Sequence, residues 1–392
     1  MNICIDGRTI YKRNTGFGYY AFYLIRHILR SECNDHITLI LHKDVANLFF
    51  MPSCRKHHEI LTAVDYRNRI LRDAWENLVL PIIFKKHNIN IFHSLTFHMP
   101  ILRIGNIKQA VTIHDLVVFK MPEIYPKYYT IYWRFIIKRS IERSSKIIAI
   151  SEATKQDIID LFNIKENKIH VIYHGIDLKR FRPKEETNEV RATLKKYSLK
   201  KPYIMAIGLS DLRKNGERIL KSYSKIIKDK TKDVSLAICG ILRKRNRVLF
   251  DQIKEHGLSD RVVMTGFVED EDLPILYRAA DLFVFPSLYE GFGFPILEAM
   301  ACGTPVITSN ISSMPEVAGD AAVLVDPYDV DAIAKAIHRV LTDNSLRETL
   351  VKKGLERVKQ FSWQKCAEET IRVYEAACNS NKSSADYADF TD

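Results

Sequence analysis

Short apolar runs alternate with longer amphipathic stretches along both halves of the chain. Runs of four to seven mostly apolar residues suit buried strands, and stretches with apolar positions three and four residues apart suit helices that cover them. We expect strands at residues 2–7, 36–41, 89–94, 110–115, 145–151, 168–174, 203–208, 235–240, 262–267, 282–286, 305–309 and 322–325. The region between residues 45 and 90 is ambiguous. The alternation predicts an α/β fold with parallel sheets wrapped by helices.

The chain is expected to form two domains, because 392 residues exceed one core of ordinary size. The boundary falls within His174-Gly175-Ile176-Asp177, which a charged, linker-like stretch follows. The expected parts are a first domain over residues 1–175, a second over residues 176–377 that includes a final helix from Trp363, and a disordered polar tail over residues 378–392. Two such domains facing each other leave a ligand cleft at the carboxyl ends of their strands.

Composition indicates a globular protein of the cytoplasm. The chain is 46% hydrophobic and 27% charged, and no apolar run approaches the ~18 residues that a membrane-spanning helix needs. The N-terminus does not have the pattern of a secretory signal. Seven scattered cysteines without a CxxC spacing argue for reduced thiols, and against a disulfide framework or a zinc site.

The positive charge is concentrated in the first half of the chain. The net charge is +12, and residues 1–175 carry 25 Lys and Arg against 15 Asp and Glu, whereas the other residues carry 34 against 32. This asymmetry favours an anionic partner, such as a membrane surface, nucleic acid or phosphorylated substrate, although a solvated basic surface is an alternative. Residues 126–146 interleave aromatic and basic side chains, which suits either a helix on an anionic bilayer or one with a buried aromatic face.

The clearest candidate site is the segment EGFGFPILE, from Glu290 to Glu298, between an expected strand and a helix. Pro295 suits the first turn of that helix, and the glycines before it permit close approach of the backbone to a ligand. The N–H groups of a helix N-terminus attract phosphate, while Glu290 in the loop and Glu298 in the first turn could accept hydrogen bonds from sugar hydroxyls. On spacing alone, acidic residues that favour the helix dipole explain the segment equally well.

Three other features lie where sites form in this fold. Arg213-Lys214 follows an expected strand, although such a pair is usually only solvated, and His114 ends a strand, where a single histidine is usually structural. Gly16 and Gly18 precede a helix expected near residue 19, and a tight turn is their alternative reading. Alanine at position 21 departs from the dinucleotide-binding GxGxxG pattern, which disfavours a dehydrogenase.

Two acidic strings have the DxD spacing of some metal-dependent transferases. They are Asp270-Glu271-Asp272 and Asp329-Val330-Asp331. Each opens an expected helix, where acidic residues serve as caps. We therefore expect no metal ion.

The segment from Ser287 to Gly303 resembles the signature of the family 4 retaining glycosyltransferases. In that signature, seven residues with a GFGLP-type sequence separate two glutamates. Other segments resemble the same family in the same order: TGFGYY its glycine loop, VTIHDL its histidine strand, HGID its domain junction, IGLSDLRKN its phosphate-binding loop, GFVEDEDLPILY its base-binding loop and FSWQKCAEETIRVYE its closing helix. The resemblance runs from residue 1 to about residue 377. It implies the GT-B fold: two Rossmann-like domains facing across a cleft, with the C-terminal helix closing back toward the N-terminal domain.

The resemblance also implies roles for single residues. Glu298 would bind the ribose of the donor nucleotide and Glu290 a hydroxyl of the donor sugar, while Lys214, helped by Arg213, would neutralise the leaving diphosphate. With no metal, a cationic side chain is also what that leaving group requires chemically. The implied catalytic residues are His114, which would lie beside the donor sugar, Lys214 and Glu290. The implied donor-binding residues are Gly16, Arg213, Lys214, Glu290, Phe292, Gly293, Phe294, Leu297 and Glu298.

We therefore expect a retaining, metal-independent glycosyltransferase that moves a hexose from a nucleotide diphosphate sugar to a glycan or lipid-linked acceptor in surface polysaccharide (lipopolysaccharide) synthesis. The N-terminal sequence, IDGR followed by TGFGYY, resembles that of mannosyl- and rhamnosyltransferases, so GDP-mannose is the expected donor. No cofactor and no nucleic acid are expected, and the N-terminal domain is expected to meet the inner face of the cell membrane peripherally. The alternatives are a sugar-nucleotide epimerase or phosphorylase on the same fold and, from another class, a basic nucleic-acid-binding protein, for which no motif is recognisable.

Overall fold

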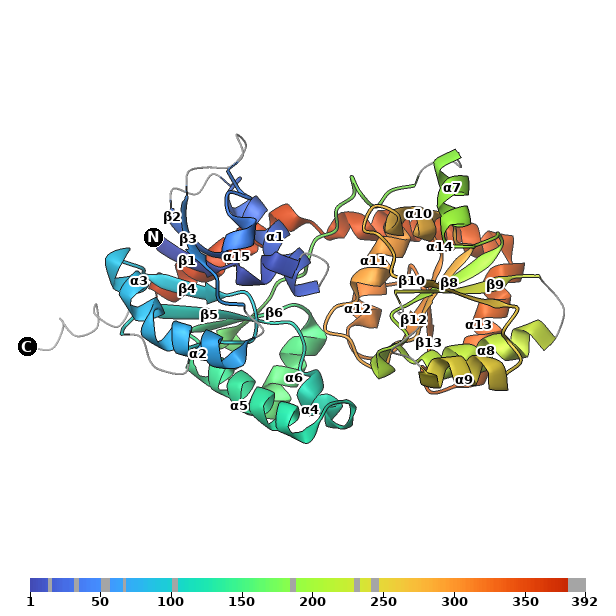
Figure 1. Ribbon diagram of the computed structural model, residues 1–392, viewed down its shortest axis with the longest axis horizontal. Coiled ribbons are helices and arrows are strands. Elements are labelled where there is room, and N and C mark those ends of the chain that lie inside the picture. The colour runs from blue at the N-terminus through green and yellow to red at the C-terminus, as the bar shows by residue number, and fades with distance from the viewer. Residues whose placement is uncertain are drawn as a thin grey trace, which may run out of the picture. The chain divides into compact units, whose positions relative to one another are not determined.

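The computed structural model describes residues 1–12, 16–31, 35–50, 57–65, 68–100, 105–183, 188–228, 233–240 and 247–379. The chain divides into two compact units: unit 1 comprises residues 1–175 together with the chain from residue 362 onward, and unit 2 comprises residues 176–361. Each unit is built on one parallel sheet flanked by helices (Figure 1). The expected α/β class, with two Rossmann-like domains, is confirmed.

Unit 1 contains a seven-stranded sheet in the order β3-β2-β1-β4-β5-β6-β7. The strands are β1 (Asn2–Asp6), β2 (His36–His42), β3 (His58–Thr62), β4 (Ile91–Ser94), β5 (Lys108–Ile113), β6 (Lys146–Ala149) and β7 (Ile169–Val171). The apolar runs predicted all of these strands except β3. This strand lies at the edge of the sheet and only its last residue is buried, so it lacks the continuous apolar pattern of a central strand.

The helices of unit 1 cover both faces of its sheet. They are α1 (Gly16–Ile28), α2 (Arg69–Leu78), α3 (Leu80–Lys86), α4 (Val117–Lys120), α5 (Lys127–Arg143), α6 (Glu152–Phe162) and α15 (Trp363–Asn379), with 3-10 turns η1 (Arg8–Lys12), η2 (Lys43–Val45), η3 (Pro122–Ile124) and η4 (Glu166–Lys168). Right-handed crossovers place α1 on one face and α2, α3, α5 and α6 on the other (Figure 1). The helix α1 begins at Gly16, earlier than the expected start near residue 19.

The final helix corrects the expected domain boundary. We expected it within the second domain, but α15 packs against α1 and against β4, β5 and β6 of the first sheet, and so belongs to unit 1. Its return to the N-terminal unit is the arrangement that the family resemblance implied. Cys378 and Asn379, expected in the tail, form the last residues of α15, and residues 380–392 lie outside the described residues.

Unit 2 contains a six-stranded sheet in the order β10-β9-β8-β11-β12-β13. The strands are β8 (Tyr203–Ile207), β9 (Ser235–Cys239), β10 (Val262–Gly266), β11 (Leu282–Phe285), β12 (Val306–Ser309) and β13 (Val323–Val325), and the apolar runs predicted each of them. The helical segments are α7 (Asn188–Lys196), η5 (Leu212–Lys214), α8 (Gly216–Lys228), α9 (Arg247–Glu255), α10 (Leu273–Ala279), α11 (Phe294–Ala301), α12 (Met314–Ala318), α13 (Val330–Thr342), α14 (Asn344–Arg357) and η7 (Val358–Gln360). Apolar side chains of α8, α9 and α13 form one core with the sheet.

Both sheets have a switch point where the chain reverses the direction in which it adds strands. In unit 1 it lies between β1 and β4, and in unit 2 between β8 and β11. Ligands of such sheets bind outside the carboxyl ends of the strands at this point. In the part of the chain that the structure describes, no helix has the length and apolar character to span a membrane.

Candidate active site

The loops after β8 and β11 bring together two of the charged residues that the sequence singled out. Lys214, at the end of η5, places its Nζ 2.5 Å from Oε1 of Glu290 in the loop after β11. The N–H of Leu288 donates to the carbonyl of Arg213 at 2.8 Å, so the backbone also joins the two loops. Since β8 and β11 flank the switch point of unit 2, this ion pair lies where the topology predicts a ligand.

Several contacts hold the Lys214–Glu290 pair in place. The Ser287 hydroxyl donates to the same Oε1 of Glu290 at 2.9 Å, and the Lys214 ammonium lies 4.6 Å from the centre of the Phe285 ring. Asn215, in the left-handed region at φ 61°, donates from Nδ2 to the carbonyls of the loops after β11 and β13 at 3.0 and 2.7 Å. The loop geometry around Lys214 is therefore fixed from three sides.

Arg213 and Lys214 are turned to different partners. The Arg213 guanidinium donates to the Asp211 carboxylate from Nη2 to Oδ2 at 2.6 Å and from Nε to Oδ2 and Oδ1 at 3.0 and 3.1 Å. Asp211 also accepts the N–H of Arg213 and so caps η5. Arg213 thus stabilises the turn that presents Lys214.

The helix after the glycine-rich segment begins as its sequence indicated. Gly293 is its N-cap residue at φ 106°, a conformation that favours glycine, and Pro295 lies in its first turn. Glu298 is the fifth residue of α11, so the prediction that placed it in the first turn was wrong. No acidic residue occupies that turn, and favourable interaction with the helix dipole therefore does not explain this glutamate.

Glu298 lies in a partly buried position beside Tyr277. The Tyr277 hydroxyl donates to Oε2 of Glu298 at 3.0 Å. Burial raises the pKa of Glu298 to about 7, while the Tyr277 hydrogen bond and the positive charges of Arg180 and Lys214 act to lower it. The charge of Lys214 therefore acts on both glutamates of the motif.

Two serines that sequence reasoning missed hold the loop that carries Glu290. The Ser312 hydroxyl accepts the N–H of Glu290 at 3.2 Å and donates to its carbonyl at 2.6 Å. The buried Ser313 hydroxyl lies 2.9 Å from the Glu290 carbonyl and 2.8 Å from that of Phe292. The only sequence signal was a pair of hydroxyl residues between a strand and a helix, which is typical of an ordinary connection.

Of the apolar residues in the predicted donor set, Phe292 and Leu297 lie in the interior of unit 2, and Phe294 is half-buried. Phe292 is buried, with its ring 5.4 Å from that of Phe294 and 5.8 Å from that of Phe361. Leu297 has no exposed surface and packs within the unit. These side chains shape the loop and the start of α11, so any contact of Phe292 with a ligand falls to its backbone.

His114 and Gly16 belong to unit 1 and lie near each other there. His114 follows β5, and its Nε2 donates to the carbonyl of Leu95 at 2.8 Å; burial lowers the pKa of the imidazole to about 4. Phe17, the neighbour of Gly16 at the start of α1, packs its ring 4.7 Å from the imidazole. Gly16 is the first residue of α1, and its predicted role in donor binding stays a prediction.

An aspartate of each acidic string binds groups within unit 2. The Asp329 side chain accepts the N–H groups of Asp331 and Ala332 at 2.8 and 2.9 Å, which confirms the expected cap of α13. The expected cap at the first string was wrong: Asp272 occupies the N-cap position of α10 without a side-chain cap bond, and its carboxylate instead binds Lys196 and Tyr197 at 2.6 and 2.7 Å.

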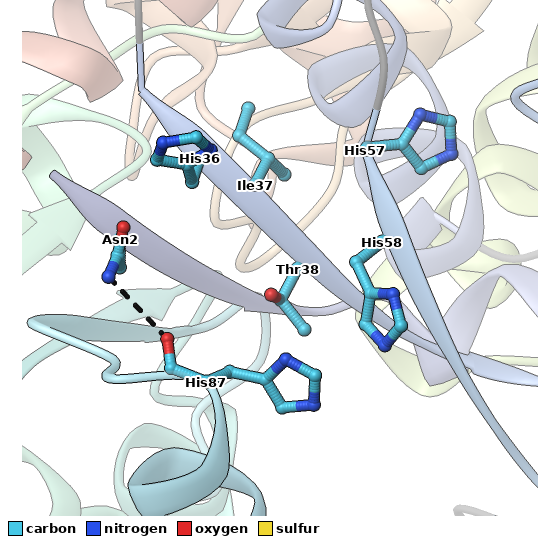
Figure 2. A pocket seen from close by; sticks show the side chains of 7 residues that line it. All are labelled: Asn2, His36, Ile37, Thr38, His57, His58 and His87. Atoms are coloured by element: carbon cyan, nitrogen blue, oxygen red, sulfur yellow. Dashed lines mark hydrogen bonds between the residues drawn. The ribbon is translucent and has the colours of Figure 1, made fainter.

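A separate pocket lies at the amino ends of β1, β2 and β3 (Figure 2). It is lined by Asn2, His36, Ile37, Thr38, His57, His58 and His87. The rings of His58 and His87 lie 4.6 Å apart, and burial together with the charges of His58 and Lys86 lowers the pKa of His87. In the described ranges, no group of three or more His, Cys, Asp or Glu residues is arranged to hold a metal ion. Ligands of this topology bind at the carboxyl ends of the strands. This pocket lies at the opposite, amino ends.

The chain has two Rossmann-like units, and a lysine and two glutamates lie near the switch point of the second. This is the architecture of the GT-B class of proteins. Residues 15–180 match the family described as Glycosyltransferase Family 4, and residues 189–357 match Glycosyl transferases group 1. The chain belongs to the family 4, group 1 glycosyltransferases and is a glycosyltransferase.

Similar proteins support this assignment. O-antigen chain mannosyltransferase B of Escherichia coli is 37% identical over 286 residues, covering 72% of this chain and 74% of that protein. O-antigen chain mannosyltransferase RfbU of Salmonella typhimurium is 30% identical over 264 residues, covering 67% and 68%. The crystal structure of Anabaena Alr3699/HepE in complex with UDP and glucose has the same fold, with a TM-score of 0.72 at 17% identity, and covers 96% of this chain and 100% of that one.

Proposed function

We propose that this glycosyltransferase transfers mannose, with retention and without a metal ion, from GDP-mannose to a hydroxyl of a glycan or lipid-linked acceptor in surface polysaccharide synthesis. The observation that carries the proposal is the Lys214–Glu290 pair at the switch point of unit 2, in a chain of this family. Mannose is supported by the two relatives named as O-antigen mannosyltransferases. The guanine base is part of the proposal and rests on the resemblance of the N-terminal sequence to mannosyl- and rhamnosyltransferases.

The proposed donor site uses the residues around α11. The Glu298 carboxylate accepts hydrogen bonds from the two ribose hydroxyls, and Glu290 accepts one from a hydroxyl of the sugar. The diphosphate lies toward the N-terminus of α11, where the helix dipole and the backbone of Phe292, Gly293 and Phe294 favour negative charge. For Gly16, contact of its backbone with the donor diphosphate stays a prediction from the family resemblance.

Lys214 is the proposed electrostatic catalyst. Negative charge develops on the nucleoside diphosphate as the bond to the anomeric carbon breaks, and a fixed ammonium group stabilises it. When the donor binds, Lys214 exchanges part of its contact with Glu290 for the diphosphate, while Glu290 turns its carboxylate to the sugar. Metal independence is supported by the engagement of Asp272 with Lys196 and of Asp329 with backbone N–H groups.

His114 is proposed to orient the donor sugar. A carbonyl oxygen can only accept, so Nε2 carries the proton shared with Leu95, and the neutral imidazole leaves a lone pair on Nδ1. With a pKa of about 4, the ring is a weak base at neutral pH. The imidazole accepts a hydrogen bond from a hydroxyl of the sugar and does not act as the base. The departing phosphate takes the proton of the acceptor hydroxyl instead. Because the acceptor attacks from the face that the phosphate leaves, the anomeric configuration is retained.

We place the enzyme in the cytoplasm, peripherally on the inner face of the membrane. The excess of basic residues in residues 1–175 supports contact between the N-terminal unit and an anionic surface. A lipid-linked acceptor would be presented at the same surface.

A donor panel tests the proposed chemistry. Purified protein in EDTA should bind GDP-mannose in calorimetry more tightly than UDP-, ADP- or dTDP-sugars, and the anomeric NMR signal of the product should show retention. Lys214→Ala should lower kcat by about a hundredfold, since it removes one charge-stabilising group. Activity that appears only with added manganese, or an inverted product, would contradict the proposal.

A further inference from the structure

The helix α5 turns an apolar stripe to the outside. Trp133, Ile136, Ile137 and Ile141 are buried beneath it. Tyr128, Ile131 and Phe135 are exposed, and their spacing of three and four residues places them on one face of the helix. The two readings of this stretch from sequence were a helix with a buried aromatic face and a helix on a bilayer. The structure divides its aromatic and aliphatic residues between the two sides.

A second stripe continues over α2 and α3. Ile70, Leu71 and Leu78 of α2 and Ile82 of α3 are exposed, with Leu78 retaining 69% of its surface. Their spacing places them along one side of the consecutive helices, while Arg72, Leu80, Ile83 and Phe84 are buried on the other side. The sequence pattern between residues 45 and 90 was ambiguous, so it did not indicate this stripe.

The two stripes belong to neighbouring helices. Arg69 of α2 lies 5.0 Å from the ring of Tyr132 of α5, and the Tyr132 hydroxyl donates to Asp73 of α2 at 3.1 Å. All three helices cover the same face of the sheet (Figure 1). Their outward side chains therefore share one outer surface of unit 1, here called the α2–α3–α5 surface and defined by Ile70, Leu71, Leu78, Ile82, Tyr128, Ile131 and Phe135.

Basic side chains accompany this apolar surface. The helix α5 carries five Lys and Arg residues and a single acidic residue, Glu142, and its Lys127 and Lys138 are exposed. The helix α3 ends with Lys85 and Lys86, which are also exposed. An apolar strip with aromatic residues and a cationic border suits the interface of an anionic bilayer, because the rings enter the headgroup layer while the ammonium groups remain at the phosphates.

We propose that the α2–α3–α5 surface docks unit 1 on an anionic phospholipid bilayer. This inference deepens the membrane location proposed above and names the side chains that carry it. It does not depend on the identity of the donor sugar. Exposed apolar side chains on three adjacent helices are unusual for a face that meets only water.

Vesicle flotation with the full-length protein tests the proposal. Wild-type protein should float with vesicles of phosphatidylglycerol and phosphatidylcholine at low salt, less at high salt, and not with phosphatidylcholine alone. Ile131→Glu and Leu78→Glu, one on each stripe, should each weaken the association by about tenfold, because each removes apolar burial and adds a repelled charge. The Leu78 variant tests the part of the surface that α2 contributes.

Val248→Glu is the matched control. Val248, on α9 of unit 2, is 68% exposed against 70% for Ile131, and its substitution changes the net charge equally. The control should float like the wild type. GDP-mannose binding by each variant in solution, measured by calorimetry, reports the donor site separately, so a failure of the proposed chemistry and a failure of docking are distinguishable.

Three results would overturn the docking proposal. The first is wild-type protein that stays unbound with anionic vesicles at low salt. The second is equal binding of the wild type and the Ile131 and Leu78 variants, or equal loss in the Val248 control. The third is a wild-type protein that is dimeric in light scattering and that Ile131→Glu converts to a monomer, with flotation unchanged. That result would assign the surface to a second copy of the chain.

Discussion

Glu298 has to meet two opposing requirements with one carboxyl group. Binding of ribose hydroxyls needs the ionised form, which accepts hydrogen bonds on both oxygens. Burial favours the neutral form and raises the pKa to about 7. The Tyr277 hydroxyl and the charge of Lys214 act against this rise, so the surroundings keep the carboxylate available near neutral pH.

As the pH rises, ionisation of Glu298 should therefore lower the stability of the fold and raise the affinity for the donor. The folded pKa of Glu298 lies above the ordinary value of 4.5, so ionisation costs the folded state stability progressively between about pH 4.5 and pH 7. Glu298→Gln removes this cost and should stabilise the protein above pH 7 by up to about 3 kcal/mol in urea unfolding, with little effect near pH 4.5.

The same substitution should weaken donor binding. Calorimetry should show wild-type affinity rising as pH increases through 7, and a lower, flat profile for Glu298→Gln. Tyr277→Phe is the companion variant: loss of its hydrogen bond should raise the pKa of Glu298 and move the wild-type affinity profile to higher pH. A pH-independent wild-type affinity would contradict the ribose assignment.

Among the elements, the connection from β12 to α12 supports the loop before α11. Ser312 and Ser313 bind the backbone of Glu290 and Phe292 on that loop, which begins after a different strand. A short strand-to-helix connection thus positions the loop that carries Glu290 through hydroxyl-to-carbonyl hydrogen bonds. Because their hydroxyls bind backbone groups of that loop, we expect the serines to act as positioning residues.

Ser313→Ala should raise the KM for the donor several-fold with a smaller change in kcat, because the loop that carries Glu290 loses two hydrogen bonds that hold its position. Ser222→Ala is the control, because the Ser222 hydroxyl is also buried and also lies near two carbonyls, of Arg218 and Val330 at 2.8 and 2.9 Å. Both variants should lose about 1–3 kcal/mol of stability. Equal KM changes in the two variants would show that Ser313 acts only on stability.

Across the whole molecule, the chain passes between the units twice at adjacent positions. The N–H of Ile176 donates to the carbonyl of Phe361 at 3.1 Å. Within unit 1, Gly175 lies directly against Trp363, and a Cβ atom there would lie 2.1 Å from the Trp363 nitrogen. The two connecting segments therefore pack so closely that only glycine fits at position 175.

Gly175→Ala should consequently destabilise the protein by about 3 kcal/mol or more, because the clash involves backbone atoms that cannot rotate away. Gly16→Ala is the control for stability, since a Cβ atom at Gly16 meets nothing within 4 Å. Thermal unfolding should show a large decrease in Tm for the first variant and little change for the second. Similar values would mean that the contact at Trp363 relaxes freely.

Local sequence patterns by themselves determined most of the elements and indicated the candidate site residues. Apolar runs marked every strand except β3, whose edge position removes the burial on which such a run depends. The spacing of Glu290 and Glu298 around a glycine-rich helix start identified the family. These features are carried by residues near one another in the chain, and their patterns survive without knowledge of the fold.

Only the tertiary structure decided which distant residues meet. It paired Lys214 with Glu290, 76 residues apart, brought the serines after β12 to the Glu290 loop, and packed α15 on unit 1 instead of the unit that precedes it in sequence. It also showed that Ile70, Leu78 and Ile131 are exposed, which the sequence pattern had left open. Burial and pairing depend on how helices and loops pack across a sheet, and a local pattern contains no information on the neighbours that packing supplies.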